Sequence, residues 1–199
     1  MSWPESVTLR GTHVTLEPLT PARHDELVEA VRDGELWKLW YTFVPTAEKM
    51  HEDIERRLEL QRKGTMLPFA IIENASGKAV GVTSYMNIDA ETRRVEIGST
   101  WYRKRVQRTA LNTECKLIML RHAFETLNCV AVEFRTHHLN QQSRRAIERL
   151  GAKLDGILRN HRYCTDGTLR DTCVYSIIAT EWPTVRSHLT FQLEKITAP

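Results

Sequence analysis

The sequence predicts an α/β fold in which helices cover both faces of a mixed, strongly twisted sheet. Strand-like segments at 67–72 and 79–88 are followed by a strand that ends at Tyr102, with only short turns between them, which is typical of an antiparallel meander. A long helical pattern then leads to another strand at 130–136, and such a right-handed crossover makes the two joined strands parallel. The dipeptide Asp166-Gly167 indicates a late hairpin.

The remaining elements follow from local signals. In chain order we expect one or two short strands within 7–19, a helix from Thr20-Pro21 to Asp33-Gly34, a helix at 47–63, a helix from Asn140 to Leu150, a hairpin of 156–163 with 172–178, and a last helix at 181–195. The charges of the 47–63 helix are predicted to form a solvated face. Aromatic residues within 36–43 can form either a lid on the core or a wall of a ligand pocket.

Composition limits the class of protein. The chain has 199 residues, 41% of them hydrophobic and 27% charged, with a net charge of +3. We expect a single domain spanning 1–199 with a sizeable core, and the charge is too small to argue for nucleic acid. No apolar run suits a membrane span and no signal peptide begins the chain, so a cytoplasmic location is expected. The four cysteines form no metal-binding pattern, and no metal is expected.

The stretch 96–125 organises the chain, because it passes from a strand through a basic turn into the longest helical pattern. Apolar residues recur there at helical steps and predict one buried face: Leu111, Cys115, Ile118, Met119, Ala123 and Leu127. Thr109 or Asn112 can cap this helix. A helix N-terminus beside arginines suits an anion, so a phosphorylated ligand at 105–111 is one interpretation. The other is a solvated basic loop.

A resemblance favours the first interpretation. The segment Arg105-Val106-Gln107-Arg108-Thr109-Ala110 resembles the acetyl-coenzyme A signature of the GNAT N-acetyltransferase superfamily, Q/R-x-x-G-x-G/A. The later part of the chain is similar to the RimJ/RimL-like branch of this superfamily, which includes acetylases of ribosomal-protein N-termini. The similarity lies in the order of five segments: Asn140 to Ser143, Leu150-Gly151-Ala152, Gly156 to Asn160, Arg170-Asp171-Thr172 and Tyr175-Ser176. The resemblance covers nearly the whole chain. Arg108 replaces the first glycine of the signature, and arginine restricts the backbone more than glycine does.

The resemblance implies a GNAT-like sheet whose central parallel strands splay apart around coenzyme A. It implies these cofactor-binding residues: Ser99, Thr100 and Trp101 along pantetheine, Arg105, Gln107, Arg108, Thr109, Ala110 and Leu111 at the pyrophosphate, and Asn140 at the pantetheine amides. It also implies acetyl-CoA as co-substrate and direct attack on the thioester by an amine. A homodimer is expected for this branch, with the late hairpin or the aromatic region as its interface.

Catalysis by direct attack needs a base for the amine and a proton for the departing thiolate. Ser143 matches the family position near the sulfur and is either the proton donor or a small residue that allows close packing. Glu96, beside apolar neighbours, is the predicted base, because burial would raise its pKa. Its alternative is a surface carboxylate paired with Arg94 or with a cross-strand partner. Asp171, His161 and Tyr163 are rival bases.

Three functions are therefore open. The first is transfer of acetyl from acetyl-CoA to a primary amine, either a protein N-terminus or a small molecule. The second is a non-catalytic acyl-coenzyme A-binding module, motivated by the missing glycine. The third is nucleic-acid binding through residues 103–108, which the sequence makes unlikely because it contains no recognised motif for it.

Overall fold

The fold is built on one mixed sheet of eight strands, ordered β1-β2-β3-β4-β5-β6-β8-β7. It comes from a computed structural model that describes residues 3–164 and 166–197. The strands are β1 (Leu9–Arg10), β2 (Val14–Pro18), β3 (Met66–Glu73), β4 (Lys78–Asp89), β5 (Arg94–Tyr102), β6 (Ala131–His137), β7 (Lys153–Tyr163) and β8 (Leu169–Ile178). Only β5 and β6 are parallel, and every other neighbouring pair is antiparallel. The predicted mixed α/β sheet is thus confirmed.

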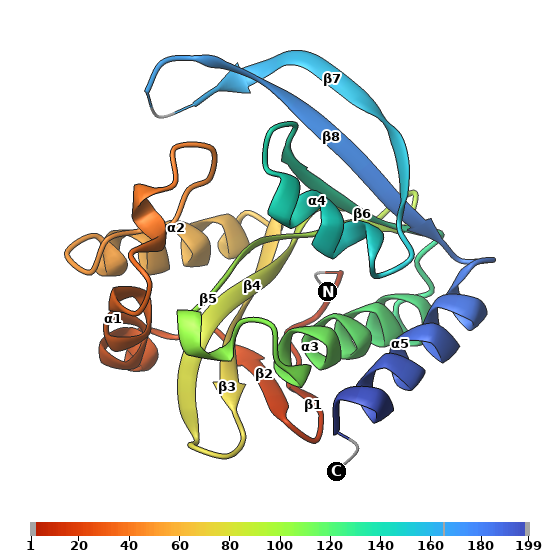
Figure 1. The fold of residues 1–199 in the computed structure, drawn as a ribbon, viewed down its shortest axis with the longest axis horizontal. Coiled ribbons are helices and arrows are strands. Elements are labelled where there is room, and N and C mark those ends of the chain that lie inside the picture. The colour runs from red at the N-terminus through yellow and green to blue at the C-terminus, as the bar shows by residue number, and fades with distance from the viewer. Residues whose placement is uncertain (1–2, 165, 198–199) are drawn as a thin grey trace.

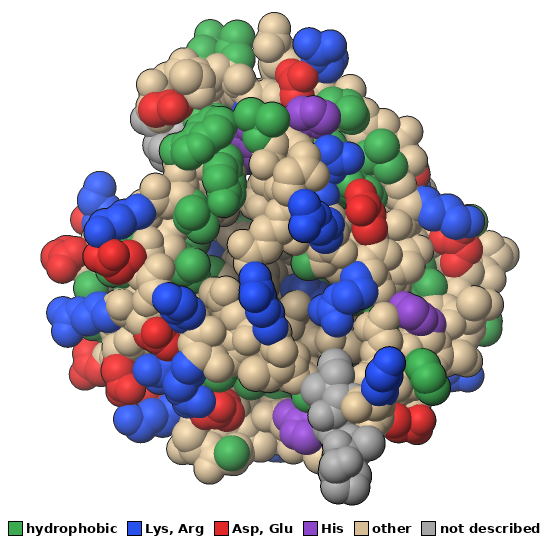
Figure 2. All heavy atoms as spheres, viewed as in Figure 1, with side chains coloured by type: hydrophobic (Ala, Val, Ile, Leu, Met, Phe, Trp, Pro, Cys, Tyr) green, Lys and Arg blue, Asp and Glu red, His purple; other side chains and the backbone are tan. Residues whose placement is uncertain are grey.

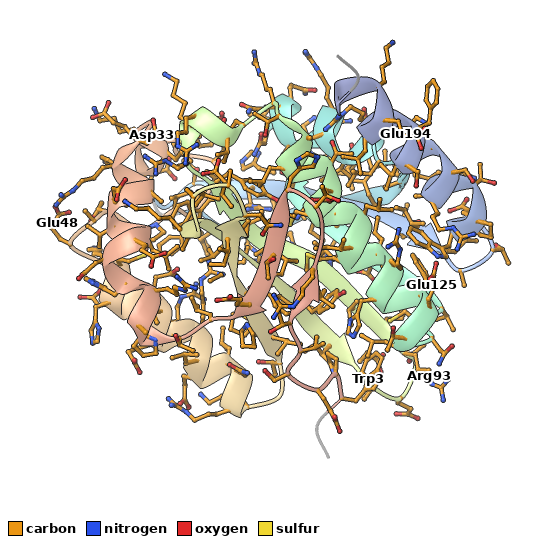
Figure 3. All side chains as sticks on the ribbon, turned by 90° about the horizontal axis from the view of Figure 1, so that it is seen from below. Trp3, Asp33, Glu48, Arg93, Glu125 and Glu194 are labelled. Carbon is orange, nitrogen blue, oxygen red and sulfur yellow. The ribbon has the colours of Figure 1, made fainter. Side chains whose placement is uncertain are left out.

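Helices cover both faces of the sheet (Figure 1). They are α1 (His24–Arg32), α2 (Met50–Arg62), α3 (Ala110–Arg121), α4 (Gln141–Glu148) and α5 (Trp182–Thr197). Viewed from below, α1 and α2 lie on one side of the sheet and α3 and α5 on the other (Figure 3). Two apolar clusters fill the spaces between them, one around Leu27, Ile54 and Trp101 and one around Tyr85 and Met119. None of the helices in the described ranges is long and apolar enough to cross a bilayer.

Helix α3 is more deeply enclosed than its sequence pattern indicates. The prediction of one buried face is wrong, because Thr113, Glu114 and Lys116 are buried along with the apolar residues. Helix α5 packs against α3 on the side away from the sheet, as Figure 1 shows. Besides the sheet and α5, the β1–β2 turn also covers α3, because the buried Glu114 binds backbone amides of that turn. These partners are about 70 to 100 residues away in the sequence, so local periodicity cannot reveal them.

The polar side chains inside α3 have specific partners. The Glu114 carboxylate accepts hydrogen bonds from the backbone amides of Thr12, His13 and Val14, at 2.8, 2.6 and 3.0 Å. It therefore fixes the β1–β2 turn to the helix. The Lys116 ammonium is 3.2 Å from the hydroxyl of Thr100 and 3.4 Å from that of Thr83. Burial lowers the pKa of Lys116.

Candidate functional site

The two parallel strands separate after a short paired stretch. β5 and β6 pair only from Arg94 with Ala131 to Glu96 with Glu133. Beyond that point β5 continues to Tyr102 against β4, and β6 continues to His137 against β8. The facing edges of the diverging strands therefore have backbone groups with no strand partner, which an extended ligand with amide groups can satisfy. The predicted splaying of the central strands is confirmed.

A bulge in β5 lies within the opening. The β4–β5 register shifts between Val82 and Ser84, and Ser99 adopts a φ of 50°. A left-handed conformation costs a non-glycine residue roughly 1 kcal/mol, so other contacts must hold it. The Ser99 carbonyl accepts a hydrogen bond of 3.1 Å from Nη1 of Arg57. The bulge is thereby tied to α2.

Arg57 is fully buried, and sequence reasoning missed it. Its Nε donates to Asp53 Oδ2 at 2.7 Å, and its Nη1 also donates to the Ser84 hydroxyl at 3.2 Å. Its Nη2 has no partner among the described residues. Burial opposes ionisation of Asp53, but Arg57 and Arg56 outweigh it and hold the pKa of Asp53 below its usual value. The prediction that the charges of α2 are all solvated is wrong here. The signal was the four-residue spacing of Asp53 and Arg57.

Glu96 lies at the apex of the opening, where β5 and β6 part. Its side chain is buried, accepts a 2.6 Å hydrogen bond from Asn87 Nδ2, and lies 3.5 Å from Nε of Arg135. Burial raises the pKa of Glu96, although Asn87 and Arg135 partly oppose this. Arg94 is paired with Glu133 instead. The alternative of a surface carboxylate paired with Arg94 is therefore wrong, but Glu96 does have a partner on the neighbouring strand, Arg135 of β6.

The rival bases Asp171, Tyr163 and His161 have different surroundings from Glu96. Asp171 accepts from the Asn160 amide and pairs with Arg159, and the Asn160 hydrogen bond is the main cause of a lowered pKa for Asp171. Tyr163 is 72% exposed. His161 lies 3.1 Å from the Thr172 hydroxyl, and burial lowers the pKa of His161. Of these carboxylates, Glu96 is the one whose pKa is raised.

Aromatic side chains lie beside the far end of β6. Trp40 and Tyr41 pack edge-on against the ring of His137, with centroids 5.1 and 6.4 Å away. Trp40 remains 47% exposed, so the aromatic group is not wholly buried as a lid on the core would be. His137 Nδ1 accepts a hydrogen bond from the Leu139 amide, which leaves Nε2 to face away from that loop. The loop between α1 and α2 thus reaches the face that carries Glu96.

At the other end of β5, the basic turn leads into α3. Thr109 caps the helix, because its hydroxyl accepts from the Leu111 amide at 3.3 Å. The Gln107 amide donates to the Lys104 carbonyl, so the amides of Gln107 and Leu111 both have internal partners. Among the described residues, no acceptor takes the amides of Arg108, Thr109 or Ala110. These three amides are available to an anion.

The arginines of this turn differ in availability. Arg105 binds both oxygens of Glu73, and Arg103 is within ion-pair distance of Asp33, which is labelled in Figure 3. Both are neutralised, which weakens the nucleic-acid interpretation. Arg108 is exposed, adopts a φ of 62° and makes no hydrogen bond or ion pair with a described residue. Arg108, which stands in place of the first glycine of the signature, thus adopts a left-handed backbone conformation that glycine adopts more easily than other residues.

The other predicted residues border the opening in different ways. Thr100 bonds to the Thr83 hydroxyl at 2.7 Å, and the buried Trp101 leaves its Nε1 without a partner among the described residues. Asn140 caps α4 by accepting from the Ser143 amide at 3.0 Å. The half-buried Ser143 hydroxyl makes no hydrogen bond to a described residue. Thr100, Trp101, Asn140 and Ser143 therefore lie on the elements that flank the gap.

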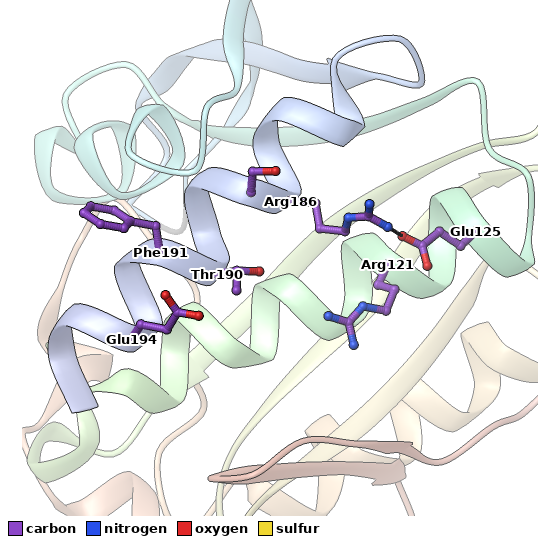
Figure 4. Close-up of a pocket in the computed structure, with 7 residues that line it drawn as sticks. Arg121, Glu125, Arg186, Thr190, Phe191 and Glu194 are labelled. Carbon is purple, nitrogen blue, oxygen red and sulfur yellow. Dashed lines mark hydrogen bonds and ion pairs between the residues drawn. The ribbon is translucent and has the colours of Figure 1, made fainter. Parts of the chain in front are cut away.

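The surface is hollowed near the centre of the face in Figure 2, where Figure 1 shows β5 diverging from β6 and α4. In Figure 2, Lys and Arg side chains lie below and to the right of this hollow, and hydrophobic side chains lie on its upper left. Two further cavities lie elsewhere. One of about 660 Å³ lies along α3 and α5, where Glu125 binds Arg186 (Figure 4). One of about 520 Å³ adjoins the α3 N-terminus, between the β1–β2 turn and the predicted pyrophosphate-binding residues Arg105, Thr109, Ala110 and Leu111. Neither is lined by Glu96 or Ser143.

Splayed parallel strands, free amides at the following helix and a buried carboxylate at the apex define the class of coenzyme A-dependent acyltransferases. The chain belongs to the acetyltransferase (GNAT) domain family, whose model matches residues 13–153. Members of this family use acetyl-CoA.

Individual relatives agree with the family. The Bacillus subtilis protein named "Putative ribosomal N-acetyltransferase YdaF" is 30% identical over 106 residues, which cover 53% of this chain and 57% of that protein. A GCN5-related N-acetyltransferase from Brucella melitensis superposes with a TM-score of 0.85 at 30% identity, covering 96% of this chain and 86% of that one. Mycobacterium smegmatis RimJ, solved with CoA-disulfide, shares the fold, with a TM-score of 0.77 at 21% identity over 96% of each chain.

Proposed function

We propose that this acetyltransferase is an N-acetyltransferase that modifies a primary amine, with a protein N-terminus as the first candidate acceptor. The observation that carries the proposal is Glu96, a buried carboxylate with a raised pKa at the point where β5 and β6 separate. A base in that position can accept a proton from an ammonium that is about to attack. Similarity to the Bacillus subtilis protein named "Putative ribosomal N-acetyltransferase YdaF" supports a ribosomal protein as the acceptor.

The residues around the opening fit acetyl-CoA. Backbone of Ser99 to Trp101 would hold pantetheine along the unpaired edge of β5, and Asn140 would reach it from α4 through its free amide group. The amides of Arg108, Thr109 and Ala110 would bind pyrophosphate, with the guanidinium of Arg108 beside them. The Gln107 and Leu111 amides and the Arg105 side chain have internal partners, so we assign them a supporting role.

When bound, acetyl-CoA supplies a thioester, and the chain positions the groups around it. Glu96 would take the proton of the attacking amine, directly or through a water molecule. Before that transfer Arg135, 3.5 Å away, stabilises the Glu96 carboxylate. Ser143, with an unengaged hydroxyl at the first turn of α4, would donate a proton or a hydrogen bond to the departing thiolate. Arg57 would act at a distance, by holding the Ser99 bulge that shapes the gap.

The test is turnover of acetyl-CoA with a panel of peptides and small amines, followed as free thiol and by acceptor mass. We expect a mass gain of one acetyl group on at least one amine, and a Ser143→Ala variant should be slower. Full turnover by Ser143→Ala would remove the proton-donor role. Binding of acetyl-CoA without acetylation of any amine would favour the non-catalytic acyl-coenzyme A-binding module.

A further inference from the structure

Two arginines face each other across the β7–β8 hairpin. Arg162 and Arg170 are direct partners in the antiparallel register. Arg170 is half-buried and donates from Nε to the Thr172 hydroxyl at 3.1 Å, and neither arginine forms an ion pair with a described residue. Like charges directly opposite each other destabilise a strand pair. A pair of this kind is therefore unexplained by folding alone.

The pair lies on the same side of the sheet as Glu96. Thr172, which binds Arg170, is opposite His137 in the β6–β8 register, and the hydroxyl of Thr172 also contacts His161. Burial lowers the pKa of His161, and the charges of Arg162, Arg135 and Arg170 lower it further. The charge of Arg162 also acts to lower the pKa of Glu96, and the charge of Arg170 acts to lower the pKa of His137. The two free guanidinium groups are thus within electrostatic range of the proposed base.

The other charges of this face cancel. Glu133 is paired with Arg94 and Arg135, and Arg135 also approaches Glu96. On the hairpin, Asp171 is occupied by Arg159. Asp166, at the hairpin tip, accepts from the amide and hydroxyl of Thr168. Among the described residues, Arg162 and Arg170 are therefore left without an ion-pair partner, and Glu96 acts on them only from a distance. In Figure 1 the hairpin arches above β6 and α4, far from the N-terminus of α3. These arginines are thus not placed to bind the pyrophosphate.

We propose that Arg162 and Arg170 bind a carboxylate of the acceptor, so that the preferred substrate is a primary amine with an acidic side chain close to it. This rests on the function proposed above. A guanidinium binds a carboxylate through two parallel hydrogen bonds, and two guanidinium groups on adjacent strands can hold one carboxylate between them. The carboxylate also relieves the repulsion between the two arginines. The amine then lies toward Glu96, at the inner end of the hairpin.

The experiment uses three C-terminally amidated peptides of one length that begin with Ala and continue with two Glu, two Gln or two Lys residues. Values of kcat/KM are measured for wild type and for an Arg162→Gln/Arg170→Gln variant. We expect wild type to prefer the Glu peptide over the Gln peptide about tenfold, as for a charge-assisted hydrogen bond. In the double variant this ratio should fall close to one. An unchanged ratio, or a preference for the Gln or Lys peptide in wild type, would overturn the proposal.

Arg159→Gln is the matched control. Arg159 lies on the same strand, but it is paired with Asp171, so its loss should leave the Glu-to-Gln ratio as in wild type. A fourth peptide with phosphoserine in place of Glu separates the two anion types, and a stronger preference for it would overturn the carboxylate assignment.

Binding of the same peptides to the protein with coenzyme A is measured by calorimetry, which needs no turnover. If wild type binds the Glu peptide and the Arg162→Gln/Arg170→Gln variant binds it more weakly, the proposal is supported even if no peptide is acetylated. If wild type does not bind the Glu peptide, the proposal is contradicted.

Discussion

At the scale of single residues, three members of the proposed site are held in unfavourable surroundings or conformations. Glu96 is a carboxylate kept in a buried position, and Ser99 and Arg108 adopt left-handed conformations. Each costs stability, and each lies at the proposed site of amine, pantetheine or pyrophosphate. Such strain is common where a backbone or a charge is prepared for a ligand.

The pH dependence of turnover tests the role of Glu96. A base must be deprotonated, so kcat/KM should rise with pH through the pKa of Glu96, which burial places above 4.5. Glu96→Gln should lose roughly 100-fold or more in turnover and lose this acidic limb of the profile. Its affinity for acetyl-CoA should be unchanged. Retention of both turnover and the acidic limb by the variant would assign the proton transfer to another group.

At the scale of elements, α2 determines the shape of β5. The ion pair of Asp53 with Arg57 is buried between them, and Arg57 holds the Ser99 carbonyl. Arg57→Met should lower the free energy of unfolding by about 3 kcal/mol, because it leaves a buried carboxylate less well paired. It should also raise the KM for acetyl-CoA. Urea denaturation and steady-state kinetics measure the two effects.

Arg56→Met is the control for that experiment. Arg56 binds the same Asp53, but its side chain is 43% exposed, so its loss should cost less than about 1 kcal/mol. Equal destabilisation by the two variants would show that burial of Arg57 is not what matters.

Helix α3 and the β1–β2 turn are joined by one carboxylate. Glu114→Ala would leave the amides of Thr12, His13 and Val14 without their acceptor. We expect a loss of about 3 kcal/mol in the free energy of unfolding, measured by urea denaturation. Glu52→Ala, at an exposed position of α2, should change it by less than about 0.5 kcal/mol. A Glu114→Ala variant as stable as Glu52→Ala would show that solvent replaces the carboxylate.

Elements were predictable where the signal was local. The meander, the Thr109 and Asn140 caps and the β7–β8 hairpin follow from alternation, capping residues and turn residues within a few positions. Enclosure of α3 by α5 and burial of Arg57 were not predictable, because they depend on partners distant in sequence. At the proposed site, the burial of Glu96 was predictable from its apolar neighbours. The ion pair between Arg105 and Glu73 could not be predicted, because it forms only when the folded sheet places β3 beside the basic turn.

At the scale of the whole molecule, the exposed apolar residues of the hairpin bear on assembly. Those on β7 and β8 that remain exposed are Leu154, Ile157, Leu158, Tyr163, Leu169 and Ile178. The homodimer expected from the sequence remains a prediction, and this hairpin is its candidate interface. Light scattering at micromolar concentration should give twice the mass of the 23.1 kDa chain. A monomeric mass would contradict it.

The central claim is that the gap between β5 and β6 holds acetyl-CoA with Arg108 at the pyrophosphate. Calorimetric titration of wild type and Arg108→Gly with acetyl-CoA tests it most directly. Because Arg108 already adopts the conformation of the missing glycine, we expect wild type to bind with a dissociation constant on the order of micromolar and the variant to bind more weakly, by about tenfold. Absence of binding by wild type, with binding restored in Arg108→Gly, would contradict the account and show that the arginine blocks the site.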